Sequence, residues 1–122
     1  LTYGGNGMEI DKDKIRRAET RKLNKLVKAV PEDKQTVAQS LTRELVFMAG
    51  TLEELRAFVD ENGAVDNFKN GRQEMLRESP ALKSYSTLIQ RYSLLYKQLC
   101  ELLPKEVAKQ AEDELMNFLG MG

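Results

Sequence analysis

Apolar residues recur at helical spacing along most of the chain, and this pattern predicts four α-helices. From Val37 to Val59 they are separated by steps of three or four residues, and the same steps run from Leu82 to Leu103. Such steps place the apolar side chains on one face of a helix. Weaker rows of the same kind precede and follow these two. Helices are therefore predicted at about residues 11–29, 33–61, 79–104 and 105–119.

Turn and capping residues divide these helices. Val30-Pro31 ends the first one, because the residue before a proline avoids the helical conformation. Asp33 is a favoured N-cap residue, so it is predicted to start the second helix. Ser79 and Pro80 are the residue types preferred at the N-cap and at the first helical position, and they predict the start of the third.

The predicted fold class is all-α. The two long helices are joined by a short connection, so they are expected to pack antiparallel as a hairpin, flanked by an N-terminal basic helix and a C-terminal helix. Gly50 permits a kink in the second helix, which we expect to continue through it. In the central connection, residues 64–78, the dipeptide Asn70-Gly71 is typical of a tight turn and leaves open a short β-hairpin.

The domain organisation follows from the same pattern. Residues 11–119 are predicted to form a single helical domain. Residues 1–10 are rich in glycine and are predicted to be a disordered or leader tail, and residues 120–122 a frayed end.

The residue types present exclude several classes of enzyme and metal site. The chain has no His and one Cys, so it cannot build a His-dependent catalytic triad, a His-ligated metal site or an internal disulfide. We expect no catalytic residue, no metal and no cofactor, and interpret Cys100 as a small helix-packing residue. No apolar run is long enough for a membrane span, so no membrane partner is expected.

Charge is unevenly placed, although the 19 basic and 19 acidic residues cancel. Lys12–Lys28 contains eight basic and two acidic residues, a net charge of +6, whereas residues 29–66 carry a net charge of −5. Cations clustered on one helix can neutralise DNA phosphates. The DNA-binding candidates are Arg16, Arg17, Arg21, Lys22, Lys25 and Lys28. A solvated helix face without a ligand is the alternative that the charges alone leave open.

The apolar face of the predicted third helix is wider than one neighbour can cover. Beside its main row, Leu88, Leu95 and Leu102 repeat every seven residues. This width favours contact with a second copy or with the last helix. Heptad spacing also favours packing over a role of the tyrosines in stacking on bases. The oligomer-interface candidates are Leu82, Tyr85, Leu88, Ile89, Tyr92, Leu95, Tyr96 and Leu99.

A family likeness lies in the second half of the chain. Its residues are Ser79, Pro80, Ala81, Lys83, Tyr85, Thr87, Leu88, Ile89 and Tyr92, followed by Leu102-Leu103-Pro104. This order resembles the Ser-Pro-Ala-x-Lys-x-Tyr-x-Thr-Leu-Ile-x-x-Tyr core and Leu-Leu-Pro ending of phage terminase small subunits. Shorter segments are similar too: Lys22–Leu26, Phe47-Met48, Thr51–Leu55, Glu61–Gly63 and Lys69–Gly71. The likeness covers about Lys14 to Lys105 and contains no catalytic motif.

The resemblance implies a role in DNA packaging. Terminase small subunits bind viral DNA near the packaging start, form ring-like oligomers and regulate the large subunit, which holds the ATPase and nuclease. The expected partners are therefore double-stranded viral DNA, the large subunit and further copies of this chain, in the host bacterial cytoplasm. Many members carry an N-terminal helix-turn-helix, whereas here the first helix stands alone before Pro31. The alternative is a helical adaptor or coiled-coil interaction protein with no DNA role.

Overall fold

The computed structural model describes residues 2–3 and 8–120, and most of them are helical. The predicted helical class is thus confirmed. The α-helices are α1 (Lys12–Val27), α2 (Gln35–Asn62), α3 (Pro80–Glu101) and α4 (Lys105–Phe118). The strands are β1 (Thr2–Tyr3), β2 (Met8–Glu9), β3 (Val65–Asn70) and β4 (Gln73–Glu78).

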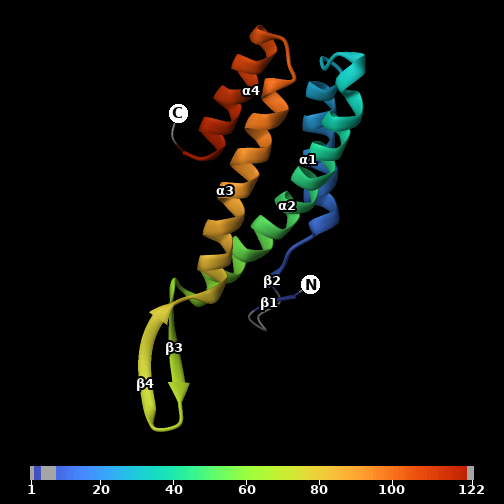
Figure 1. The fold of residues 1–122 in the computed structure, drawn as a ribbon. Coiled ribbons are helices and arrows are strands. Elements are labelled where there is room, and N and C mark those ends of the chain that lie inside the picture. Colours follow the sequence, from blue (N-terminus) through green and yellow to red (C-terminus); the bar gives the residue numbers. More distant parts are fainter. Residues whose placement is uncertain (1, 4–7, 121–122) are drawn as a thin grey trace.

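The helices form an elongated bundle. α2 and α3 are the long antiparallel pair, α1 packs on α2, and α4 packs on α3 (Figure 1). The β3–β4 hairpin connects α2 to α3 and projects beyond the end of the bundle (Figure 1). α1 and α4 therefore lie outside the α2–α3 pair, α1 against α2 and α4 against α3.

The ends of the chain are described in part. Residues 1 and 4–7 of the predicted tail, and residues 121–122 of the predicted frayed end, lie outside the described residues. Within the tail, Thr2–Tyr3 pairs antiparallel with Met8–Glu9.

The junction between α1 and α2 differs from its prediction. Asp33 lies inside a 3₁₀ turn, and the N-cap residue of α2 is Lys34, whose side chain makes no capping bond. Gln35 supplies the contacts that hold this turn, because its Nε2 donates to the carbonyl oxygens of Val27 (2.7 Å) and Val30 (2.8 Å). The prediction that Asp33 caps α2 is therefore wrong.

Two other boundary predictions are confirmed. α2 continues through Gly50 to Asn62 without a break. Ser79 is the N-cap of α3, since its Oγ accepts from the backbone N–H of Leu82 at 3.4 Å, and Pro80 is the first helical residue. The hydroxyl thereby pairs one of the free N–H groups that every helix start exposes.

The β-hairpin that the sequence left open is present. Its two strands pair over six residues each, ending with Asn70 opposite Gln73. The loop is Gly71-Arg72, one residue later than the predicted Asn70-Gly71. Gly71 has φ +63°, and no non-glycine residue in the described part has positive φ. A positive φ at the first loop position alone is the type II′ pattern, which favours glycine there.

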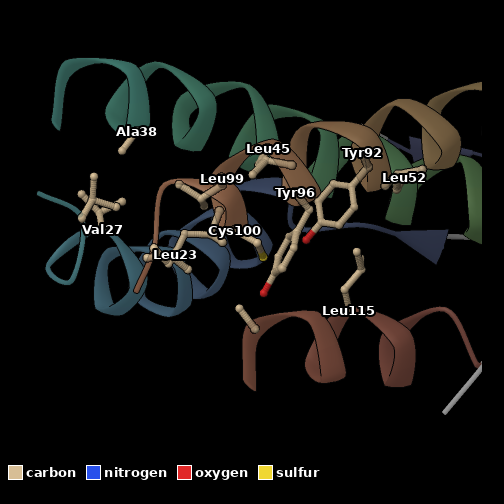
Figure 2. Close-up of a cluster of buried hydrophobic side chains, with 13 residues drawn as sticks. Leu23, Val27, Ala38, Leu45, Leu52, Tyr92, Tyr96, Leu99, Cys100 and Leu115 are labelled. Carbon is tan, nitrogen blue, oxygen red and sulfur yellow. The ribbon is translucent and has the colours of Figure 1, made fainter. Parts of the chain in front are cut away.

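The core lies between the four helices and consists mainly of aliphatic side chains (Figure 2). Leu23 of α1, Leu45 of α2 and Leu99 of α3 are fully buried. Cys100 belongs to the same cluster, and burial, more than the nearby acidic residues, raises the pKa of its thiol to about 11. Its interpretation as a packing residue is confirmed.

Tyr96 links the stability of this core to pH. Its ring is buried, and its hydroxyl has no hydrogen-bond partner in the described part of the chain. Burial raises the pKa of Tyr96 above its usual range, and the nearby Cys100, Glu114 and Glu19 raise it further. Because the pKa in the unfolded chain is near 10, the stability contributed by the neutral phenol is complete below about pH 10 and is lost above it.

We therefore expect Tyr96→Phe to reduce the alkaline loss of stability, while Tyr92 and Cys100, whose pKa values burial also raises, keep contributing to it. At neutral pH the change removes only an unpaired buried hydroxyl, so the free energy of unfolding should stay the same or rise. Urea unfolding measured from neutral pH to about pH 11 tests this. Tyr85→Phe, at a half-buried tyrosine on the same helix, is the control. An alkaline slope that Tyr96→Phe leaves unchanged would contradict the assignment.

Candidate nucleic-acid interface

The eight basic side chains of the Lys12–Lys28 segment divide into two groups. Lys12, Arg16 and Lys22 are partly buried and contact other residues of the chain, whereas five are exposed. We call these five the cationic stripe: Lys14, Arg17, Arg21, Lys25 and Lys28. The division separates residues that hold α1 in place from residues that can meet a ligand.

Arg16 joins α1 to α2. One terminal guanidinium nitrogen, Nη2, donates to the backbone oxygen of Phe47 at 3.1 Å and to Oγ1 of Thr51 at 3.4 Å. The guanidinium carbon lies 4.9 Å from the centroid of the Phe47 ring, in a cation–π contact. One turn earlier on α1, Lys12 pairs with the buried carboxylate of Glu54 at 3.0 Å.

The contact between Arg16 and α2 explains a glycine inside a helix. A Cβ atom at Gly50 would lie 2.5 Å from Nε of Arg16, too close for an undisturbed side chain. Glycine in a helix interior costs about 1 kcal/mol relative to alanine. Here it leaves room for the guanidinium to cross the surface of α2.

Lys22 joins α1 to α3 and α4. Its Nζ pairs with Oε1 of Glu19 at 3.2 Å and lies 5.6 Å and 5.8 Å from the ring centroids of Tyr96 and Phe118. The hydroxyl of Tyr92 donates to the other oxygen of Glu19. Burial raises the pKa of Tyr92 well above its usual range, and the Glu19 carboxylate adds to this effect, so the phenol stays protonated and able to donate.

The cationic stripe occupies one side of α1. Its members are spaced by three, four, four and three residues, which places them within an arc of about 80° and along about 21 Å of helix. Within the described residues, no carboxylate forms an ion pair with any of the five. Their charge is therefore not neutralised inside the chain and is available to an anionic partner.

A shallow depression lies along the N-terminal half of this surface. It has a volume of about 400 Å³ and is lined by Asp13, Arg16, Arg17, Thr20 and Arg21. Arg17 and Arg21 are exposed at this hollow and can donate charge-assisted hydrogen bonds to a phosphate oxygen, whereas the guanidinium of Arg16 is already bonded to α2. Asp13 is the one acidic residue of the lining and limits the positive potential at that end.

The structure thus places four of the six DNA-binding candidates, Arg17, Arg21, Lys25 and Lys28, on one exposed stripe. It places the other two, Arg16 and Lys22, in contacts within the chain. Lys14 joins the stripe and was not among the candidates. A helical projection of the sequence would have found it, because it lies within the arc of the other four.

The oligomer-interface candidates also divide. Tyr92, Tyr96 and Leu99 are buried within the single chain, between α3 and its neighbouring helices (Figure 2). The remaining five are half-buried: Leu82, Tyr85, Leu88, Ile89 and Leu95. α4 covers part of the wide apolar face of α3, so only the half-buried members remain accessible to another molecule.

Comparisons with known proteins identify no relative, so the function of the cationic stripe is interpreted from its chemistry alone. No protein-family model matches the chain, and searches of the curated proteins and of the solved structures find no similar protein. Among the described residues, no group of three acidic or cysteine side chains lies close enough together to hold a metal ion. None of the helices there is long and apolar enough to cross a membrane.

The division of the basic residues predicts unequal effects of two adjacent substitutions on stability. Arg16→Ala should lower the free energy of unfolding by about 1–3 kcal/mol, because it removes charge-assisted hydrogen bonds and the contact with Phe47. Arg17→Ala, the matched control, should change it by less than about 0.5 kcal/mol. Urea denaturation of both variants measures the difference, and equal losses would mean that the Arg16 contacts contribute nothing specific.

Proposed function

We propose that this chain is the non-catalytic small subunit of a phage terminase and binds double-stranded viral DNA through its phosphates. The observation that carries the DNA contact is the cationic stripe, five exposed cations on one side of α1 that form no ion pair with any described residue. Duplex DNA carries about one negative charge per 1.7 Å of axis, so a helix face about 21 Å long spans many phosphates. The sequence resemblance to terminase small subunits supports the packaging role.

The contact is electrostatic and has little sequence preference. Lysine and arginine side chains that meet phosphates position a protein on DNA without reading its bases. In this proposal the large terminase subunit supplies the ATPase and nuclease, and the present chain delivers DNA to it. Several copies assembled in a ring would present several stripes to one duplex, so weak contacts add up to useful affinity.

Salt dependence tests the DNA contact. If all five cations of the stripe meet phosphates, the logarithm of the association constant should fall with the logarithm of salt concentration at a slope of about −4.5. Arg17→Ala with Arg21→Ala should reduce the magnitude of the slope by about 1.8 and weaken binding to unrelated duplexes alike. Fluorescence anisotropy with labelled duplexes measures both quantities.

The matched control removes two cations elsewhere. Lys69 and Arg72 lie at the tip of the β-hairpin, at the far end of the molecule from most of α1 (Figure 1). Replacing both by alanine should leave the slope unchanged. If the hairpin variant loses as much as the α1 variant, the binding is a general response to net charge, and the stripe is only a solvated helix face.

Assembly is a separate prediction. Native mass spectrometry of the purified chain should give a closed oligomer of several copies, because half-buried apolar residues of α3 remain accessible to another copy. A monomer at all concentrations, with DNA binding intact, would reject the ring but retain the DNA contact.

A further inference from the structure

α3 is longer than the helix that covers its outer side. It has 22 residues against 14 in α4, or about 33 Å against 21 Å. α4 starts immediately after Pro104 and therefore lies beside the C-terminal half of α3 (Figure 1). On the side that α4 covers, the N-terminal half of α3 has no helix of the described residues beside it (Figure 1).

A groove of about 590 Å³ runs along α3 from Tyr85 to Lys97, partly past the end of α4 and partly beside it. α3 provides its floor, the end of α4 one limit, and α2 contributes Arg56. Its apolar lining residues are Tyr85, Ile89, Leu94, Phe118 and Leu119. Leu94 is 58% exposed and Phe118 46%, values that are high for such large apolar side chains gathered in one place.

The charged residues of the groove all have the same sign. Arg56 and Lys97 are exposed lining residues, and no carboxylate lines the groove. Arg56 makes only a long surface pair with Glu53, at 3.8 Å, which contributes little. Lys97 has no ion-pair partner in the described part of the chain. The groove is thus apolar along its floor and positive at its sides.

We propose that this groove binds an acidic amphipathic α-helix of a partner protein, lying along α3 and about three turns long, the length of α3 between Tyr85 and Lys97. Apolar residues spaced by three or four would pack on Ile89 and Leu94, as in other helix-in-groove contacts. Carboxylates beside that row would pair with Arg56 and Lys97. The groove lies on α3 and α4 whereas the cationic stripe lies on α1, so the inference does not depend on DNA binding.

A pair of designed peptides tests the proposal on the full chain. The first is a 14-residue helix, about the length of α4, with leucines at helical spacing and glutamates beside them. The second carries lysine in place of every glutamate. Isothermal titration calorimetry should detect binding of the acidic peptide, and binding of the basic peptide should be about tenfold weaker or absent.

Reversing the charge of the groove should make the protein prefer the basic peptide over the acidic one. Arg56→Glu with Lys97→Glu should weaken the acidic peptide about tenfold and allow the basic peptide to bind. Arg43→Glu with Arg72→Glu is the control with the same change in net charge outside the groove, and it should leave the preference in place. Both sites are exposed, so the helical circular dichroism spectrum should be retained in both double variants.

Three outcomes would overturn the proposal. Equal binding of both peptides would mean that the groove is merely apolar, and binding of neither would mean that it holds no such helix. Dissociation of a native oligomer by Leu94→Ser would mean that a second copy fills the groove, since Tyr85 and Ile89 also belong to the predicted oligomer interface. Arg17→Ala with Arg21→Ala should leave peptide binding unchanged, which separates failure of this proposal from failure of the DNA contact.

Discussion

The carboxylate of Glu19 fixes the rotation of α1 about its own axis. It is partly buried, accepts a hydrogen bond from Tyr92 of α3 and pairs with Lys22 at 3.2 Å. A carboxylate withdrawn from water needs such partners, and rotating α1 would remove the hydrogen bond from Tyr92 and leave Glu19 with Lys22 of its own helix alone. Glu19 lies about 160° around the helix from the middle of the cationic stripe. The same contact that anchors α1 therefore turns its five free cations toward solvent.

α3 is the element that all other parts share. Tyr92 donates to Glu19 of α1, and its ring centroid lies 5.5 Å from that of Phe118 of α4. Leu99 lies in the core with Leu45 of α2 (Figure 2). The hairpin is supported mainly at its base, where the N–H of Ser79 donates to the oxygen of Ala64 at 2.9 Å. A two-stranded hairpin alone is marginal in water, so the ordered ends of α2 and α3 hold its strands in register.

The helices could be predicted from the sequence because helical periodicity is a local property. The rows from Val37 to Val59 and from Leu82 to Leu103 need no tertiary information, and the Ser79-Pro80 start is equally local. The start of α2 and the position of the hairpin turn were off by one or two residues. At the start of α2 the side chain of Gln35, and not that of Asp33, makes the hydrogen bonds that hold the junction. In the hairpin the positive φ is at Gly71, so the loop begins there and not at Asn70.

The candidate site was predicted less completely, because it depends on which side of α1 packs inward. Arg16 and Arg17 are adjacent and chemically identical, yet only Arg17 is exposed. Arg16 differs from Arg17 because its side chain packs against Gly50, which has no side chain, and against Phe47. Both residues are more than thirty positions away in the chain. A charge count treats the two arginines alike, whereas the packing of α2 separates them.

The projecting hairpin divides the chain into two helical parts, α1 with α2 and α3 with α4. Lys69 and Arg72 flank its tip in an exposed turn, the kind of place where trypsin cuts a folded protein. A nick there would leave one fragment with α1 and α2 and another with α3 and α4. Because the core is built from side chains of both, the fragments should remain associated after cleavage. The molecule is therefore suited to being produced as two separate polypeptides that reassemble, with the tip of the hairpin as the point of division.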